Sequence, residues 1–294
     1  MSKAYIFPGQ GSQFSGMGRS LYESSRQARE LMEEADKILG FKITDIMFNG
    51  SAEDLKRTEV TQPAIFIHSC ALALCSGLSR PDMVAGHSLG ELAALCTAGV
   101  LEFPQALELV RRRAEAMQRC CEKNPGGMAA IIGLEDKVIE DCCASVQEGL
   151  VVAANYNCNG QVVISGEEEA VKVACEKLKA LGARRALPLA VSGAFHSALM
   201  EGAAEELADI IEKLDFKDAQ IPVYQNVTAK PEKDASRIRE NLLRQLTSPV
   251  LWTKTVENML ADGADSFLEL GPGTVLQGLV RRIAGAEVEI SGIQ

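Results

Sequence analysis

The stretch Gly86-His87-Ser88-Leu89-Gly90 decides the fold of this chain and points to its chemistry. It matches the pattern G-x-S-x-G, in which a serine sits on a sharp turn between a strand and a helix. The run Pro81–Ala85 before it predicts a short strand, and Glu91–Ala98 after it predicts a helix closed by Gly99. The two glycines would let strand and helix pack closely, so that the Ser88 hydroxyl projects outward at the N-terminus of the helix.

Ser88 is therefore the candidate nucleophile. The N–H of Leu89 would point to the place where an oxyanion forms, and the dipole of the following helix favours negative charge there. A chance match in an ordinary turn is the alternative, and the strand before the turn and the apolar helix after it argue against that alternative. The sequence thus predicts covalent chemistry at Ser88 with a backbone oxyanion hole.

The loop Gly9-Gln10-Gly11-Ser12-Gln13 follows a first apolar strand, Ala4–Phe7. A phosphate-binding loop is one interpretation, but Phe14 breaks the pattern G-x-G-x-x-G and no Gly-Lys-Ser/Thr follows. We favour the other interpretation, in which the N–H of Gln10 is the second donor of the oxyanion hole.

A serine nucleophile needs a base, and the chain contains 3 histidines. His87 is adjacent to Ser88, so its side chain should leave the turn in another direction. His68 lies within an apolar helix, where a hydrogen-bonded core histidine is favoured over a catalytic one. His196 is the candidate base by elimination, and its place after Ser88 in the chain is compatible with α/β-hydrolase topology.

No predicted strand between Ser88 and His196 ends in an acid that would project into the site. We therefore expect a dyad, in which a neutral group such as a backbone carbonyl orients the imidazole.

Arg111, Arg112 and Arg113 lie in the middle of a predicted helix. A solvated face is the usual role of such a run, but successive helical residues point about 100° apart, so one of the three could turn inward to hold an anion.

Predicted strands alternate with predicted helices along most of the chain, which indicates an α/β fold with a parallel sheet covered on both faces. Residues 124–192 instead show the order β-α-β-β-α-β, which is typical of a ferredoxin-like domain. We expect a large α/β-hydrolase-like domain formed by 1–123 and 193–294, with the small ferredoxin-like domain inserted at 124–192. The predicted helices of the large domain include 20–39, 63–78, 104–123, 198–214, 237–247 and 252–262.

Composition excludes several classes of protein. The net charge of −10 argues against a nucleic-acid binder, which needs a basic face. The 9 cysteines include no C-x-x-C spacing, which argues against common zinc sites and a disulfide framework and favours reduced thiols. The chain begins without an apolar run of signal-peptide length, and its most apolar stretch, Ala64–Leu78, is too short to span a bilayer. We expect a cytoplasmic protein with no metal and no membrane contact.

Seven further motifs accompany Gly86–Glu91 in the chain, in a fixed order. They are Phe7–Gln13, Thr61–Ala64, Arg113 with Gln118, Gln161–Gly166, Ala194–His196, Pro249 with Trp252–Lys254, and Glu269–Gly273. With these motifs essentially the whole chain resembles the malonyl-CoA:acyl carrier protein transacylases and, more broadly, the acyltransferase domains of fatty acid and polyketide synthases.

The resemblance implies transfer of a malonyl group from malonyl-CoA to the phosphopantetheine thiol of acyl carrier protein, through an acyl-serine and without a cofactor. Ser88 would be the nucleophile and His196 the base, and the N–H groups of Gln10 and Leu89 would form the oxyanion hole. Arg113 would pair bidentately with the free carboxylate of the malonyl group, a task that suits its planar fork.

The resemblance also assigns the walls of the pocket. Gln62 would line it, and Phe195 is the residue that malonyl-specific relatives carry before the histidine, where it would crowd an α-methyl branch. Asn155 and Asn157 would lie in the cleft, with turn-forming asparagines as the equal alternative. The main-chain carbonyl that holds the histidine would be that of Leu251, although relatives usually have Gln at this position.

We predict an acyltransferase that works by ping-pong catalysis on malonyl-CoA and a typically acidic acyl carrier protein, and we expect a monomer. A serine esterase or thioesterase is the alternative among enzymes, but it would not need Arg113 and would normally supply an acid for the histidine. A non-catalytic carrier-protein-binding module is the alternative from another class. The presence of Ser88, His196 and Arg113 together argues against such a module.

Overall fold

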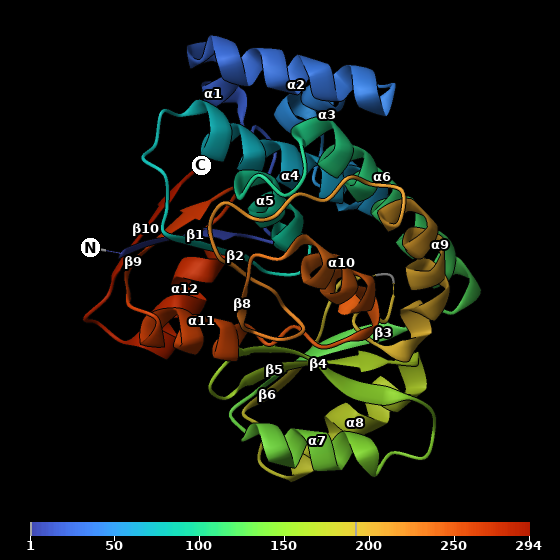
Figure 1. The fold of residues 1–294 in the computed structure, drawn as a ribbon. Helices are drawn as coiled ribbons and strands as arrows, with labels where there is room; N and C mark the ends of the chain where they lie inside the picture. The colour runs from blue at the N-terminus through green and yellow to red at the C-terminus, as the bar shows by residue number, and fades with distance from the viewer. Residues whose placement is uncertain (1, 192) are drawn as a thin grey trace.

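Two separate β-sheets carry the fold of residues 2–191 and 193–294, the part of the chain that the computed structural model describes (Figure 1). The larger sheet has the strand order β10-β9-β1-β2-β7-β8. All of its pairings are parallel except that of β7 with β8. Its strands are β1 (Ser2–Phe7), β2 (Met83–Gly86), β7 (Val223–Tyr224), β8 (Pro231–Glu232), β9 (Ala264–Leu270) and β10 (Glu289–Ile293).

Helices surround the larger sheet, and the first three helices of the chain form a layer at one end of the molecule (Figure 1). These three are α1 (Arg19–Ser24), α2 (Arg26–Leu39) and α3 (Ile43–Asn49). The other α-helices of this part are α4 (Thr58–Cys75), α5 (Gly90–Thr97), α6 (Phe103–Lys123), α9 (Glu201–Ile211), α10 (Ala235–Arg244), α11 (Trp252–Ala261) and α12 (Val275–Ala284). The 3₁₀ helices are η1 (Asp54–Lys56), η2 (Ala198–Met200) and η3 (Gln245–Thr247).

Strand β1 illustrates why both faces of the larger sheet are buried. Tyr5 and Phe7 belong to the core cluster built with α2, α4, α5 and α6, whereas Ala4 and Ile6 belong to the cluster built with α11 and α12. Successive side chains of a strand point to opposite faces, so a strand covered on both sides needs an apolar residue at every position. The sequence Ala-Tyr-Ile-Phe meets that requirement.

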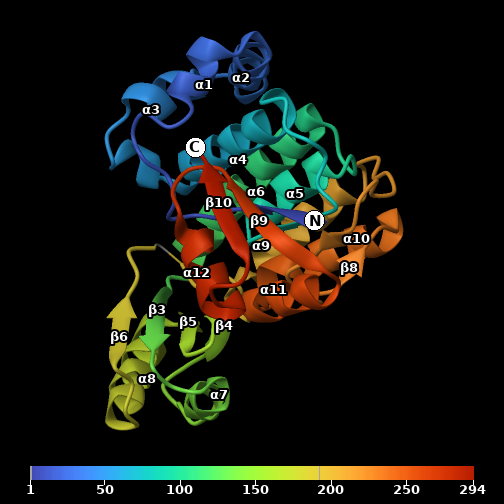
Figure 2. The same ribbon diagram turned by 90° about the vertical axis from the view of Figure 1, so that its left-hand side faces the viewer.

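The smaller sheet is antiparallel, with the order β4-β5-β3-β6, and α7 and α8 pack on one of its faces (Figure 2). Its core contains Ala129, Ile131, Val162 and Ile164 together with residues of the two helices. An isolated bridge between Asn155 and Val250 joins this sheet to the rest of the chain. The elements in chain order are β3 (Gly127–Ile132), α7 (Asp136–Ala144), β4 (Val151–Cys158), β5 (Gln161–Gly166), α8 (Glu168–Ala180) and β6 (Arg185–Pro188).

The prediction of a mixed α/β fold with a largely parallel sheet is confirmed, and several element boundaries differ from it. The helix expected over 20–39 is interrupted at Ser25, which is extended and whose side chain accepts the N–H of Ala28 to begin α2. The helix expected to begin at Pro63 begins at Thr58, so that Pro63 lies inside α4. Helices α3 and α12 and strands β8 and β10 were not predicted.

None of the helices within the described part of the chain combines the length and the apolar character needed to cross a membrane.

Candidate active site

Ser88 occupies the sharp turn between β2 and α5 that the sequence predicts. Its φ of 52° lies in the left-handed region, where a non-glycine residue is strained. A Cβ built on Gly86 would lie 1.9 Å from the carbonyl carbon of Gly90, and one on Gly90 would lie 2.1 Å from the carbonyl oxygen of Phe7. Both glycines are therefore required by the close approach of β1, β2 and the start of α5.

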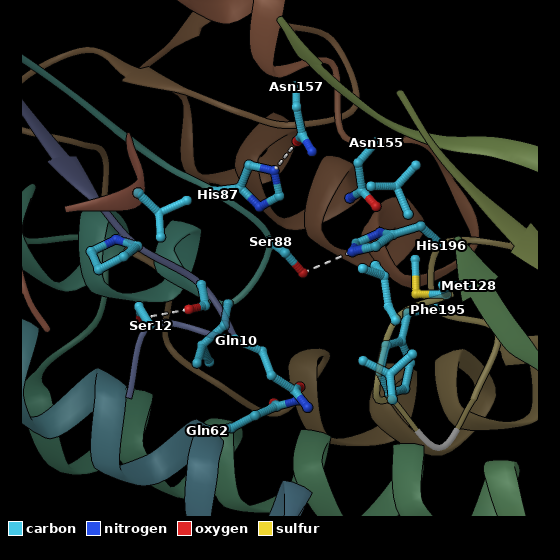
Figure 3. Close-up of a pocket in the computed structure, with 18 of the residues that line it drawn as sticks. Gln10, Ser12, Gln62, His87, Ser88, Met128, Asn155, Asn157, Phe195 and His196 are labelled. Carbon is cyan, nitrogen blue, oxygen red and sulfur yellow. Dashed lines mark hydrogen bonds between the residues drawn. The ribbon is translucent and has the colours of Figure 1, made fainter. Parts of the chain in front are cut away.

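His196 meets Ser88 across the cavity, with 2.7 Å between Ser88 Oγ and His196 Nε2 (Figure 3). The other ring nitrogen, Nδ1, lies 3.1 Å from the main-chain oxygens of both Gln245 and Ser248. Carbonyl oxygens can only accept, so Nδ1 carries the proton and Nε2 is left free to accept the Ser88 hydroxyl. The expected dyad thus has the geometry of a serine and its general base.

The carbonyl predicted to hold the histidine was the wrong one. We expected Leu251, but its carbonyl accepts the N–H of Thr255 and so closes the first turn of α11. The two oxygens that reach His196 come from Gln245 and Ser248, on the 3₁₀ helix η3 and just after it. The acceptor is a neutral backbone carbonyl, as expected. It comes from Gln245 and Ser248, which precede Leu251 in the chain.

The imidazole of His196 is neutral at ordinary pH. Burial lowers its pKa to about 3, and the nearby guanidinium of Arg113 adds to the effect. The side chain is 4% exposed, so water contributes little to stabilising an imidazolium. His196 itself has a φ of 59°, so both members of the dyad lie in left-handed backbone.

Of the three consecutive arginines, Arg113 alone turns inward. Arg111 and Arg112 form ion pairs with Glu108 and Glu115 on the outer face of α6. Arg113 is 3% exposed, and its NH2 group lies 3.2 Å from Ser88 Oγ.

The guanidinium of Arg113 is fixed by two amide oxygens rather than by a carboxylate. NH1 donates to Gln62 Oε1 at 2.8 Å, and NH2 donates to Gln245 Oε1 at 3.2 Å. Within residues 2–191 and 193–294, Arg113 forms no ion pair. Burial lowers its pKa to about 10, which leaves it charged at neutral pH. The carboxyl of Glu91 acts on this cation electrostatically but makes no ion-pair contact with it, so the guanidinium beside Ser88 can still receive a negatively charged group directly.

A cavity of about 410 Å³ opens over the dyad and gathers the remaining predicted site residues (Figure 3). The predicted oxyanion-hole residues, Gln10 and Leu89, both line it, and Leu89 stands at the N-terminal end of α5. The other predicted residues on its wall are Gln62, Asn155, Asn157 and Phe195.

The two asparagines of β4 have different surroundings. Asn157 accepts a hydrogen bond from His87 Nε2 at 2.8 Å, which draws the His87 ring away from Ser88 as predicted (Figure 3). Asn155 forms the isolated bridge to Val250 and is 6% exposed. Neither asparagine sits in a turn, because β4 runs from Val151 to Cys158.

His68 is a core residue but not the hydrogen-bonded one that we expected. Both of its ring nitrogens lack a hydrogen-bond partner within the described residues. Its Cδ2 and the methyl groups of Met32 and Met47 all lie within 3.5 Å of the position that a Cβ on Gly18 would take, so this side of the ring faces apolar groups. Burial lowers its pKa to about 4, and the ring is neutral.

Three buried polar residues around Ser88 were missed by the sequence analysis: Glu91, Asn226 and Gln245. Gln245 holds three groups, since its carbonyl accepts from His196, its Oε1 accepts from Arg113 and its Nε2 donates to the Ser88 carbonyl. Glu91 adjoins the G-x-S-x-G pattern, and an acid on a buried helix face is a signal that could have been followed. Asn226 and Gln245 carried no local signal, because they reach the site from distant parts of the chain.

A family model described as "Acyl transferase domain" matches residues 4–290. The chain belongs to this family and is an acyltransferase.

Among curated relatives, the malonyl CoA-acyl carrier protein transacylase of Bacillus subtilis (strain 168) is 45% identical over 289 residues, covering 96% of this chain and 91% of that protein. The protein of the same name from Staphylococcus aureus (strain MRSA252) is 41% identical. The match covers 100% of this chain and 96% of that protein.

Solved structures of malonyltransferases are also similar to this chain. The acyl carrier protein S-malonyltransferase of Vibrio cholerae superposes with a TM-score of 0.95 at 44% identity, covering 100% of this chain and 97% of that one. A malonyl-transacylase solved in complex with its type II PKS acyl-carrier protein gives a TM-score of 0.94 at 43% identity. The match covers 99% of this chain and 95% of that one.

Proposed function

We propose that the protein transfers a malonyl group from malonyl-CoA to the phosphopantetheine thiol of an acyl carrier protein, through a malonyl ester of Ser88, and so supplies extender units for fatty acid or polyketide synthesis. One observation carries the choice of substrate. The buried guanidinium of Arg113 lies 3.2 Å from Ser88 Oγ and makes no ion-pair contact with a carboxylate of the described residues, although Glu91 acts on it electrostatically. An acyl group that ends in a carboxylate would supply the direct partner that the guanidinium lacks.

In the first half-reaction Ser88 Oγ attacks the thioester carbonyl of malonyl-CoA while His196 Nε2 takes the hydroxyl proton. The tetrahedral oxyanion would be stabilised by the N–H groups of Gln10 and Leu89, with the N-terminus of α5 favouring the negative charge. Collapse of this intermediate breaks the C–S bond, and the proton on His196 passes to the departing coenzyme A thiolate. The malonyl ester of Ser88 remains.

The second half-reaction runs the same steps in the opposite sense. The phosphopantetheine thiol loses its proton to His196 Nε2 and attacks the ester carbonyl, and the proton then returns to Ser88 Oγ as the C–O bond breaks. One base thus serves both halves. The kinetics would be ping-pong because coenzyme A leaves the malonyl-enzyme before the carrier protein binds. The carbonyl partners of His196 at Gln245 and Ser248 keep Nε2 unprotonated between the steps.

Arg113 would bind the malonyl carboxylate with its planar fork, held in place by the amide oxygens of Gln62 and Gln245. Phe195, on the cavity wall beside the dyad, would exclude a branch at the α-carbon of the acyl group. Asn155 and Asn157 would form the side of the cleft contributed by the smaller sheet.

Incubation with radiolabelled malonyl-CoA tests this function. We expect a stable malonyl-enzyme that discharges onto an acyl carrier protein, and no labelling of the Ser88→Ala variant, since loss of such a nucleophile costs about 10⁶ in turnover. Rapid release of free malonate would instead identify a hydrolase. A protein that binds the carrier but acquires no label would be a binding module.

We further infer that the two sheets mark two domains, an α/β-hydrolase-like one at 1–123 and 193–294 and a ferredoxin-like one at 124–192. The order β4-β5-β3-β6 of the smaller sheet supports the second assignment. The cytoplasmic location, the monomeric state and the absence of nucleic-acid partners stay predictions from the sequence.

A further inference from the structure

The side-chain amide of Asn226 spans the turn that carries the nucleophile. Its Nδ2 donates to the carbonyl of Gly86 at 2.6 Å, and its Oδ1 accepts the N–H of Ser88 at 2.7 Å. Asn226 is 1% exposed and lies just after β7, the strand next to β2 in the sheet. One amide therefore binds the residues on both sides of His87.

This contact matters because of the conformation of Ser88. A φ of 52° is strained for serine and persists only when the surroundings hold it. The N–H of Ser88 faces Asn226 and so is not available to an oxyanion in the cavity. The carbonyl of Ser88 accepts the N–H of Glu91 and the side-chain amide of Gln245. Both peptide groups of the nucleophile are thus hydrogen-bonded.

Asn226 is itself fixed by Glu91. The main-chain N–H of Asn226 donates to Glu91 Oε2 at 2.7 Å, and Glu91 Oε1 accepts from Gln225 Nε2 at 3.2 Å. The Gln225 carbonyl oxygen, Oε1, accepts from Asn241 at 2.9 Å. The carboxylate of Glu91 is 1% exposed, and burial raises its pKa to about 7. A buried acid in contact with the backbone of a distant loop is a rigid link between that loop and α5.

We propose that Asn226 is a positioning residue for acyl transfer. Its amide clamps the two sides of the nucleophile turn, so that Ser88 Oγ stays in line with His196 Nε2, and Glu91 fixes the main chain from which that amide projects. The proposal rests on the proposed function in taking Ser88 as the nucleophile. A residue that only stabilised the fold would instead change the amount of active enzyme and leave its rate constant alone.

Single-turnover kinetics of malonyl-enzyme formation separate these two roles. The amplitude of the acylation phase counts folded enzyme, whereas its rate constant at saturating malonyl-CoA reports the alignment of Ser88 and His196. For Asn226→Ala we expect a normal amplitude per folded protein, a dissociation constant for malonyl-CoA within about twofold of wild type, and a rate constant lowered about 10²-fold, the effect expected from a misplacement of about 1 Å.

Two conservative variants grade the effect. Asn226→Asp keeps an oxygen to accept the Ser88 N–H but loses the donor to the Gly86 carbonyl, so its rate constant should lie between those of wild type and Asn226→Ala. Glu91→Gln keeps the size of the side chain but points an N–H₂ group at one of two donors, Asn226 N–H or Gln225 Nε2. We expect a loss of roughly tenfold in the same rate constant, since that misfit reaches Ser88 indirectly, through Asn226 and through Gln245, whose side-chain amide also interacts with Glu91.

Asn258→Ala is the matched control. Asn258 Nδ2 donates to the carbonyl of Ala229 at 2.7 Å, so this variant removes an equivalent amide–carbonyl bond from the same loop without touching the turn. It should keep the wild-type rate constant. A wild-type rate constant in Asn226→Ala, or an equal loss in Asn258→Ala, would overturn the proposal.

If Asn226→Ala does not fold, Asn226→Asp decides, and an unchanged rate constant in that variant would also overturn the proposal. A wild-type protein that forms no malonyl-enzyme would overturn the proposed function instead, so the two failures are distinguishable.

Discussion

At the residue scale, Arg113 and His196 share a buried site in which the guanidinium disfavours a positive charge on the imidazole. Burial lowers the pKa of both, and Arg113 lowers that of His196 further. The permanent guanidinium keeps its charge and the imidazole stays neutral, which suits Arg113 to the proposed role of anion receptor and His196 to the proposed role of base. The same cation lies 3.2 Å from Ser88 Oγ, where it also favours the removal of the hydroxyl proton.

The pH dependence of acylation follows from the pKa of His196. Its value of about 3 lies below the ordinary value of 6.5, so the base becomes protonated only in acid. The kcat/KM for malonyl-CoA should therefore not fall with a midpoint near 6.5 as the pH is lowered from 8 to about 5. Stopped-flow acylation across this range is the measurement.

Glu91 provides the internal control for that experiment, because its pKa is raised to about 7. A midpoint near 7 that disappears in Glu91→Gln would belong to Glu91. A midpoint near 6.5 that persists in Glu91→Gln would contradict the low pKa of His196.

Arg113 should determine the preference for a carboxylated acyl group. Removing one partner of a buried charge pair costs about 3–5 kcal/mol, so Arg113→Ala should lose about two to three decades in kcat/KM for malonyl-CoA and gain activity with acetyl-CoA relative to malonyl-CoA. Arg112 lies on the same helix, but its side chain is exposed and paired to Glu108. Arg112→Ala should leave the activities with malonyl-CoA and with acetyl-CoA unchanged. Equal losses with both substrates in Arg113→Ala would mean a structural role.

At the scale of elements, the segment from η3 to the start of α11 positions His196 through main-chain atoms. Leu251 holds its place with an N–H to Asn226 and a carbonyl to Thr255, and its side chain is only partly buried. Leu251→Gln and Leu251→Ala should therefore keep acyl transfer within roughly tenfold, with any loss due to packing. A loss of several decades in these variants, with folding intact, would show that the side chain orients the histidine.

Two glycines in helices should respond to alanine in opposite ways. A Cβ on Gly90 at the start of α5 would lie 2.1 Å from the Phe7 carbonyl oxygen, so Gly90→Ala should displace β1 or prevent folding. Gly278 lies exposed in α12, and a Cβ there has open space. Gly278→Ala should raise the free energy of unfolding by about 0.5–1 kcal/mol, because alanine loses less backbone entropy in a helix. Denaturant titration of Gly90→Ala and Gly278→Ala measures the free energy of unfolding of each variant.

Elements with a strong local pattern could be predicted from the sequence, and the site residues could be predicted where a motif marked them. Ser88, His196 and Arg113 meet as expected because a motif, the scarcity of histidines and a resemblance each pointed to one of them. Asn226 and Gln245 were missed because their roles depend on which distant segments lie side by side, and no local pattern encodes that. The error at Leu251 has the same cause, since a main-chain acceptor carries no side-chain signature.

At the scale of the whole molecule, charge opposes the proposed partnership. The net charge of −10 would repel an acidic carrier protein, so docking requires local basic surface. Arg184 and Arg185 are exposed at the start of β6, the edge strand of the smaller sheet. Residues 230–254 contribute six Lys or Arg against three Asp or Glu.

We predict that added salt raises the KM for the carrier protein more than the KM for malonyl-CoA, since exposed charges are screened within about 10 Å at 0.1 M salt. Reversing Arg184 and Arg185 to Glu should raise the carrier KM further and flatten its salt dependence. Arg26→Glu with Lys37→Glu is the matched control, because it changes the net charge equally on α2, at the opposite end of the molecule from the smaller sheet (Figure 1). Equal effects of the two double variants would mean that only the overall charge matters, and no change in the Arg184 and Arg185 variant would show that these are ordinary solvated side chains.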